Sequence, residues 1–226
     1  NKKICSSSVD ELFNRGPDSL KINYFFNNSL FFANTVLSIT GNLNTNKKIV
    51  SSKNNKFHIS FNGEIYNYKQ LNNEHLNYSY DTDTEVLVNL HEKINFNKIP
   101  ILLNGMFAYA ILDINNRDIK IVTDPQGEKS IYYYNDEKYF LASSTIKSII
   151  SFLKSSKINV EIDKKVIKDY FSTRHYMPIG KTCFKNIKIL ENASILKFNL
   201  KNLNLINNKY ENPLNWITEK NYRMYS

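Results

Sequence analysis

Four strand-like runs follow one another between residues 105 and 144, and they constrain the fold more than any other feature of the chain. Each run is rich in β-branched or aromatic residues, and polar turn-forming pieces separate them. The runs are GMFAYAILDI, DIKIVTD, SIYYYND and EKYFLASS. Strands at this spacing form antiparallel hairpins, because parallel strands need crossover connections of a dozen residues or more. The sequence therefore predicts a largely antiparallel sheet.

Further strands and helices surround this region. Apolar residues at helical spacing predict helices over 81–94, 146–153 and 166–171, the last of them ending before Pro178. Ser8 and Glu11 form a Ser-x-x-Glu capping box, which predicts a short first helix from Ser8 that ends at Gly16-Pro17. Strands are expected over 24–39, over 57–61 where apolar and polar residues alternate, and as a final pair over 182–200. The order of elements predicts one domain with an α+β fold.

Composition excludes some classes of protein. At 226 residues, with 42% hydrophobic and 13% aromatic residues, the chain resembles globular proteins, so its asparagine-rich stretches NNKF and NLKNLNLINNK are expected to be loops. The net charge of +9 could serve a nucleic-acid partner, but the lysines are scattered, which favours solvated faces. No apolar run approaches the roughly 18 residues of a membrane span.

The two cysteines support neither a disulfide framework nor a metal site. Cys5 and Cys183 lie far apart, and the N-terminus lacks the layout of a signal peptide. We therefore expect a reducing, cytoplasmic setting, with no bound metal, no membrane association and no nucleic-acid partner.

Five motifs occur in one order along the chain. They are RGPD at 15–18, FNGEIYNY at 61–68, DTDTEVL at 81–87, LNGMFAYAILD at 103–113 and DPQGEKSIYYY at 124–134. Each motif alone is weak, but five in this order make a chance match improbable. From about residue 14 to residue 200 the chain resembles the glutaminase domain of asparagine synthetases, which are class II glutamine amidotransferases. The resemblance implies an N-terminal-nucleophile fold, a four-layer αββα sandwich of two antiparallel sheets.

The resemblance also implies roles for four residues. Hydrolysis of a glutamine side-chain amide needs a nucleophile, a base and donors for the oxyanion of the tetrahedral intermediate. By resemblance, the side-chain amide of Asn62 and the backbone N–H of Gly63 form the oxyanion hole. Glu64 and Asp83 match the positions that hold the ammonium group of bound glutamine, for which a carboxylate is a suitable partner. The family's nucleophile is an N-terminal cysteine, and its own α-amino group, with an ordinary pKa of about 7.7 to 8.0, serves as the base.

The same residues have plainer interpretations. Asn-Gly is the commonest hairpin pair, since both residues tolerate positive φ, so Asn62-Gly63 also fits a turn. Asp83 also fits the cap of the helix expected over 81–94, a role that contributes roughly 1 kcal/mol. RGPD fits the end of the first helix, and DPQGEKSIYYY fits a tight loop between two strands.

Two positions depart from the family pattern. Residue 1 is Asn, and Cys5 is not terminal, so we expect Cys5 to be an ordinary thiol and the nucleophile to lie upstream of Asn1; true loss of the nucleophile is the alternative. The family's Arg-Leu-Ser-Ile run pairs its arginine with the α-carboxylate of glutamine, but Val36 stands at that position and cannot form the pair. Lys47 or Lys48 could supply a cation instead.

The resemblance implies a larger protein. Asparagine synthetase-like enzymes pass ammonia to a C-terminal domain that uses ATP and Mg²⁺, and residues 1–226 contain no Gly-rich phosphate loop. We expect 1–208 to be the amidotransferase domain, with its extreme N-terminus missing, and 209–226 to be a connector to that synthetase domain. This segment is then expected to need no cofactor, with glutamine and the synthetase domain as partners and a homodimer possible.

Two functions remain open from the sequence. The first is ammonia release from glutamine for ATP-dependent amidation of a carboxylate such as aspartate. The second is a glutaminase-like domain without activity, kept as a structural or partner-docking module, for which Val36 is the main argument.

Overall fold

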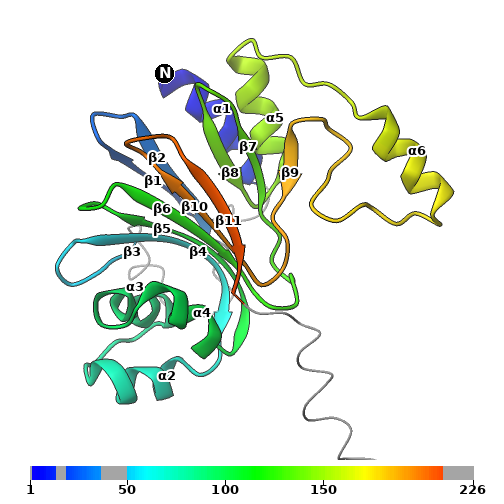
Figure 1. Ribbon diagram of the computed structural model, residues 1–226. Helices are drawn as coiled ribbons and strands as arrows, with labels where there is room; N and C mark the ends of the chain where they lie inside the picture. The colour runs from blue at the N-terminus through cyan, green and yellow to red at the C-terminus, as the bar shows by residue number, and fades with distance from the viewer. Residues whose placement is uncertain (1, 14–18, 37–49, 211–226) are drawn as a thin grey trace, which may run out of the picture. The chain divides into compact units, whose positions relative to one another are not determined.

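The computed structural model describes residues 2–13, 19–36 and 50–210 (Figure 1). Two compact units form, each from two stretches of the chain. Unit 1 comprises residues 1–49 and 130–191, and unit 2 comprises residues 50–129 and 192–226.

Unit 2 is built on an antiparallel sheet of six strands in the order β11-β10-β6-β5-β4-β3. The strands are β3 (Val50–Ser51), β4 (Phe57–Ile65), β5 (Gly105–Asp113), β6 (Asp118–Thr123), β10 (Ser194–Asn199) and β11 (Leu205–Lys209). The strands predicted over 57–61, 105–114 and 118–124 are confirmed. The expected loop at NLKNLNLINNK is wrong in its second half, because β11 forms there. Its side chains are largely exposed, so pairing of its backbone with β10, rather than burial, supports it.

Short helices cover one face of this sheet (Figure 1). They are α2 (Tyr68–Leu71), a π-helical turn (Asn72–Leu76), α3 (Asp83–Lys93), a 3₁₀ turn (Phe96–Lys98) and α4 (Ile99–Leu102). The predicted helix over 81–94 is therefore confirmed as α3. It begins at the N-cap Thr82, whose hydroxyl accepts from the Glu85 N–H while the Glu85 side chain accepts from the Thr82 N–H. This capping box fixes the start of α3.

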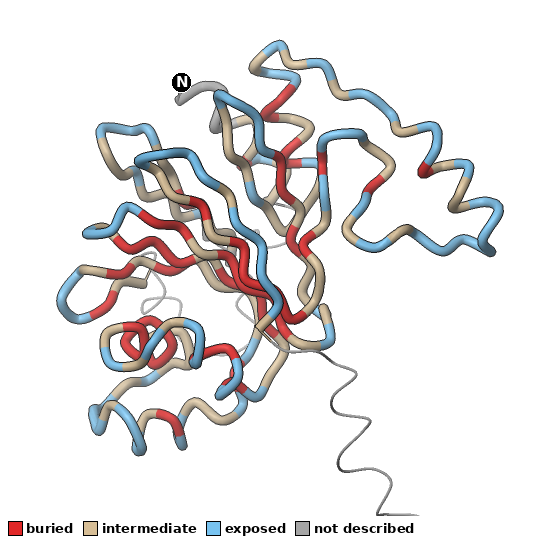
Figure 2. The backbone as a smooth tube through the Cα atoms, viewed as in Figure 1, coloured by how far each residue is buried: buried red, intermediate tan, exposed pale blue. Residues whose placement is uncertain are grey.

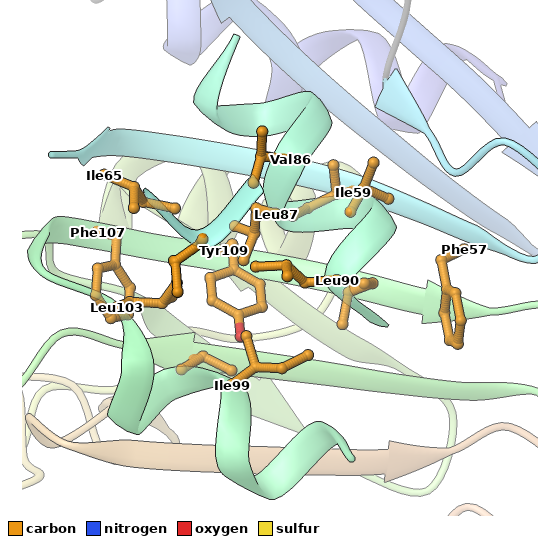
Figure 3. Packing of buried hydrophobic residues seen from close by; sticks show 14 of the residues in the cluster. Phe57, Ile59, Ile65, Val86, Leu87, Leu90, Ile99, Leu103, Phe107 and Tyr109 are labelled. Carbon is orange, nitrogen blue, oxygen red and sulfur yellow. The ribbon is translucent and has the colours of Figure 1, made fainter. Parts of the chain in front are cut away.

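The core of unit 2 lies between α3, α4 and the sheet (Figure 3). Val86, Leu87 and Leu90 of α3 are at most 1% exposed and pack with Ile59 of β4 and Tyr109 of β5. Full burial of such a side chain stabilises the fold by about 1.5–3 kcal/mol. This packing holds β4 and β5, the two strands that carry the FNGEIYNY and LNGMFAYAILD motifs.

The described residues of unit 1 form a hairpin, a three-stranded antiparallel sheet in the order β8-β7-β9, and three helices. The elements are α1 (Lys2–Phe13), β1 (Ser19–Phe25), β2 (Leu30–Val36), β7 (Tyr132–Asn135), β8 (Phe140–Ser143), α5 (Ile146–Ser155), α6 (Lys164–Ser172) and β9 (Ile187–Ile189). Ile149 and Leu153 of α5 pack with Tyr134 and Ile187 in a small core. The helices predicted over 146–153 and 166–171 are confirmed.

Two expectations for the remaining elements are wrong, and a third is confirmed with other bounds. The first helix does not start at Ser8, because α1 already begins at Lys2, so Ser8 lies inside the helix and cannot cap it. The expected end of this helix at Gly16-Pro17, with the RGPD motif, lies outside the described residues. The strand region 24–39 is a hairpin that turns at residues 26–29, and residues 37–39 are again outside the described part. The strand pair expected over 182–200 is wrong, because β9 pairs with β7 while β10 pairs with β6.

Helix α6 is largely solvent-exposed, and Val166 is its only buried residue (Figure 2). Apolar side chains of α6 and of the segment after it are also exposed, with Phe171 at 67%, Tyr176 at 72% and Ile179 at 73%. Among the helices of the described ranges, none combines the length and the hydropathy that a membrane crossing requires.

Candidate functional site

Asn62 and Gly63 lie inside a strand rather than in a turn. β4 continues to Ile65, and Asn62 faces Ala108 and Gly63 faces Phe107 in an unbroken antiparallel register with β5. The interpretation of Asn62-Gly63 as a hairpin turn is therefore wrong. A glycine within a strand often marks a place where another backbone approaches closely.

Gly63 allows such an approach. Its φ of +142° is one that side-chain-bearing residues rarely adopt, and a Cβ at this position would lie 2.0 Å from the Met106 carbonyl oxygen and 2.7 Å from the Phe107 Cα. Gly105 is equally confined, since a Cβ there would lie 2.1 Å from the Glu64 carbonyl oxygen. The two glycines let β4 and β5 come together at the level of residues 63–65.

The Gly63 N–H points away from β5. Asp124 N–H donates to the Phe107 carbonyl oxygen over 2.8 Å, which turns the Phe107 peptide groups toward β6 and away from β4. Gly63 and Phe107 therefore form a non-hydrogen-bonded pair of the antiparallel ladder, in which both residues direct their N–H and C=O groups away from the partner strand. The N–H of Gly63 and that of Ile65, two residues later, therefore leave β4 on the side opposite β5.

Asp83 occupies the side of β4 to which these amides point. Its Oδ2 accepts the Ile65 N–H over 3.0 Å, and its Oδ1 accepts from Thr84 N–H (2.6 Å) and Thr84 Oγ1–H (3.2 Å). Asp83 is the first residue of α3, where the positive end of the helix dipole favours a carboxylate. The interpretation of Asp83 as the helix cap is wrong, because Thr82 performs that role. The carboxylate is half-buried, and its two oxygens have capacity for a further donor.

Asn62 and Glu64 lie on the other face of β4 from Ile65. Side chains alternate along a strand, and Ile65 is buried in the core under α3, so Asn62 and Glu64 project from the opposite face. Asn62 is half-buried and Glu64 is exposed. The structure thus brings the Gly63–Ile65 backbone together with the Asp83 carboxylate, and it places the Asn62 and Glu64 side chains on the face of β4 opposite that of Ile65.

Sequence reasoning missed the part played by Asp124. The residue follows β6 and is 1% exposed, and its carboxylate accepts four backbone N–H groups: Phe107 (3.3 Å), Gln126 (2.9 Å), Glu128 (3.1 Å) and Lys129 (3.1 Å). The interpretation of DPQGEKSIYYY as a tight loop between two strands is confirmed for residues 124–131, which join β6 to β7, whereas residues 132–134 already belong to β7. The signal was an Asp after a strand with Gly three residues later, a pattern typical of a side-chain-organised turn.

Two ionisable side chains, His91 and Tyr109, are buried in the interior of unit 2. His91 of α3 is buried beside Phe57, Phe96 and Tyr109, and burial, assisted by the charge of Lys120, lowers its pKa to about 3. Burial also raises the pKa of the Tyr109 hydroxyl well above its usual range. Within the described chain, neither His91 ring nitrogen nor the Tyr109 hydroxyl has a hydrogen-bond partner. These groups therefore favour their neutral forms.

Other sequence candidates add little to the site. Cys5 lies in α1 and Val36 is the last residue of β2, but the side chains of both are outside the described part of the chain, as are Lys47 and Lys48. Cys183 is a half-buried free thiol. The described residues contain no group of three or more His, Cys, Asp and Glu side chains arranged to hold a metal ion.

Comparison with known proteins gives this geometry a context. The family model for the glutamine amidotransferase domain matches residues 1–211. Asparagine synthetase [glutamine-hydrolyzing] 1 of Bacillus subtilis is 32% identical over 189 residues, which cover 81% of this chain and 28% of that protein. Asparagine synthetase [glutamine-hydrolyzing] 3 of the same organism is 28% identical over 211 residues, covering 90% of this chain and 33% of that protein. The chain thus spans about a third of the length of these relatives.

Solved structures with the same fold have diverged far in sequence. Glutamine phosphoribosylpyrophosphate amidotransferase from B. subtilis superposes with a TM-score of 0.63 at 13% identity, over 92% of this chain and 46% of that one. The allosteric regulatory enzyme of purine biosynthesis superposes with a TM-score of 0.57 at 15% identity, over 79% of this chain and 34% of that one. These similarities confirm the predicted N-terminal-nucleophile amidotransferase fold.

Proposed function

Because this chain belongs to the glutamine amidotransferase domain family, we propose that it is the part of an asparagine synthetase-like enzyme that releases ammonia from glutamine. The ammonia would amidate a carboxylate such as aspartate, in asparagine biosynthesis. The observation that carries the proposal is the hydrogen bond from Ile65 N–H to the Asp83 carboxylate, because it joins two motifs 18 residues apart beside Gly63.

The proposed roles follow from the chemistry of each group. The Gly63 N–H and the Asn62 side-chain amide are donors, so they would stabilise the negative oxygen of the tetrahedral intermediate; loss of one such donor typically lowers the rate about 10²–10³-fold. Asp83 lies on the side of β4 to which the Gly63 N–H points, and Glu64 follows Gly63 in the strand; these two carboxylates would hold the ammonium group of glutamine. Asp83 is already oriented by its bonds to Ile65 and Thr84, so little ordering is needed when the substrate binds.

The remaining chemistry would reside elsewhere in the complete protein. The proposed nucleophile is a cysteine at a mature N-terminus upstream of Asn1. The proposed partner is a C-terminal synthetase domain of the same chain, which would bind ATP and Mg²⁺, and the relatives are about three times as long as this chain. Cytoplasmic localisation and a homodimer belong to the same proposal.

A second candidate function is a glutaminase-like domain without activity. It is favoured by one observation, Val36 at the position where the family pairs an arginine with the glutamine α-carboxylate. Valine offers no hydrogen bond to a carboxylate, so this candidate predicts that glutamine does not bind.

Glutamate release from glutamine by the full-length protein distinguishes the two candidates. We expect steady turnover and, for Asp83→Asn, a raised KM for glutamine, since the variant loses the charge that would attract the ammonium group. Asp81→Asn is a matched control, because Asp81 lies two residues earlier, before the N-cap Thr82, and is exposed. Absence of glutamate release by the full-length protein would favour the inactive module.

A further inference from the structure

We propose that Asp124 is a positioning residue for the oxyanion hole, holding the Gly63 amide in place through the backbone of Phe107. This inference rests on the proposed function of Gly63. Asp124 lies in the loop that joins β6 to β7, and none of the roles proposed above belongs to it.

The Asp124 side chain replaces a backbone acceptor at the end of β6. At the Phe107 level, the Asp124 N–H donates to the Phe107 carbonyl oxygen over 2.8 Å, as a continued β6 would. The Asp124 carbonyl oxygen does not return the bond, because it accepts from Gly127 N–H (3.1 Å) and Ala193 N–H (3.0 Å) instead. The Asp124 Oδ2 accepts the Phe107 N–H in its place, over 3.3 Å.

The backbone of Phe107 packs directly against Gly63. Gly63 and Phe107 face each other across β4 and β5, at a pair whose peptide groups point away from one another. The Phe107 Cα lies 2.7 Å from the position that a Gly63 Cβ would occupy, so the two backbones are in direct contact. A shift of Phe107 therefore moves Gly63, and with it the direction of the Gly63 N–H.

Backbone hydrogen bonds fix the position of the Asp124 carboxylate. It is 1% exposed, and the amides of Gln126, Glu128 and Lys129 donate to it together with that of Phe107. Four N–H donors suit a carboxylate and no other side chain, because an amide would turn an NH₂ group toward some of them. The loop and the strand are thus connected through one buried group.

Asp124→Asn in the full-length protein tests this role. The variant keeps the shape of the side chain but replaces one acceptor oxygen with a donor, so β5 should shift at Phe107. We expect kcat for glutamate release to fall about tenfold or more while the KM for glutamine stays within about twofold, because an oxyanion donor acts in the transition state rather than on bound substrate. Asp124→Glu, which keeps two acceptor oxygens, should recover part of the rate.

Asp113→Asn is the matched control. Asp113 ends the same strand β5, is 5% exposed and accepts backbone N–H groups from Asn115 and Asn116, each over 3.0 Å. It faces Phe57 at the far end of β4 from Gly63. This variant should lose similar stability, yet its kcat should remain close to that of the wild-type protein.

A readout independent of activity separates this inference from the proposed function. Residues 1–226 contain 6 glycines, and ¹⁵N-glycine labelling of the full-length protein limits the spectrum to glycine amides, among which Gly63 can be followed. Asp124→Asn should shift the Gly63 resonance and Asp113→Asn should not. If the wild-type protein hydrolyses no glutamine but this shift occurs, the proposed function fails while the positioning role holds. An unchanged Gly63 resonance in folded Asp124→Asn, or equal losses of kcat in both variants, would overturn the inference. If Asp124→Asn does not fold, Asp124→Glu gives the same two readouts.

Discussion

Helices α3 and α6 have similar lengths, 11 and 9 residues, but very different surroundings. Six residues of α3 are buried against the sheet of unit 2, whereas Val166 is the only buried residue of α6 in unit 1. Instead, Tyr170, Phe171 and His175 contact one another edge to face near the exposed end of α6. Both helices are apparent from sequence periodicity, yet of the two only α3 packs against β4, the strand that carries the candidate site. A catalytic donor needs a backbone fixed to within about 0.5 Å, and dense packing provides this.

The largest expected difference in stability loss between the two units comes from replacing a glycine with alanine. Gly63→Ala should lower the free energy of unfolding by about 4 kcal/mol, because the new Cβ would meet the backbone of β5 and the φ is unfavourable. Gly180→Ala in unit 1 also has a positive φ, +73°, but its Cβ would lie 3.5 Å from the nearest atom, so about 1 kcal/mol is expected. Urea denaturation of both variants measures the difference. Equal losses would show that β4 and β5 are not in tight contact.

The next effect compares the two helices directly. Leu87→Ala removes a 0%-exposed side chain of α3 and should cost about 3 kcal/mol, whereas Phe171→Ala removes a 67%-exposed side chain and should change stability by less than about 0.5 kcal/mol. The same denaturation experiment checks both. A loss above about 2 kcal/mol for Phe171→Ala would contradict the exposed position of α6.

A pH effect is expected from His91 in α3. Its native pKa of about 3 lies below the value of about 6.5 expected for an unfolded chain, so as the pH falls between these values the unfolded state takes up the proton first. The free energy of unfolding should therefore decrease with falling pH, by up to about 1.4 kcal/mol per pH unit, with no contribution above about pH 6.5.

His91→Phe tests this assignment. Burial also lowers the pKa of His58, so the wild-type slope contains both histidines, and the difference between wild-type protein and variant isolates His91. The variant should show a shallower slope between pH 6.5 and pH 4, measured by urea denaturation at each pH. Identical slopes would place the His91 imidazole in contact with solvent.

The smallest expected loss of stability comes from removing the N-cap residue of a helix. Thr82→Ala should destabilise the protein by about 1 kcal/mol, because it removes the N-cap of α3. Ser8→Ala removes the same type of residue from the interior of α1, where no cap is needed, and should change stability by less than about 0.5 kcal/mol. If Ser8→Ala cost as much as Thr82→Ala, the helix start predicted from sequence at Ser8 would be correct after all.

The sequence predicted elements whose signals are local. The spacing of Val86, Leu87 and Leu90 and the capping residues identified α3, and alternation identified β4. The sequence could not decide between a turn and a strand at Asn62-Gly63, because the deciding fact is the approach of β5 from more than 40 residues later. The pairing of β9 and β10 with different sheets, and the formation of β11 from asparagine-rich sequence, are likewise set by distant partners.

The candidate site was likewise predicted in part, with the contacts between distant segments left for the structure to show. Motifs indicated Asn62, Gly63, Glu64 and Asp83 through family resemblance, and the structure adds the contact from Asp83 to the Ile65 N–H. The Asp124–Gly127 pattern indicates a turn organised by a side chain, but it does not reveal that the Asp124 carboxylate also accepts the Phe107 N–H from a strand 17 residues earlier.

Titration of ¹⁵N-glycine-labelled full-length protein with glutamine, under conditions of slow turnover, tests the central claim most directly. If β4 and Asp83 form the glutamine site, the Gly63 amide resonance should move saturably with glutamine concentration, and Asp83→Asn should require a higher concentration for the same movement. A Gly63 resonance that stays fixed while another glycine responds would show that glutamine binds elsewhere, and would contradict the account.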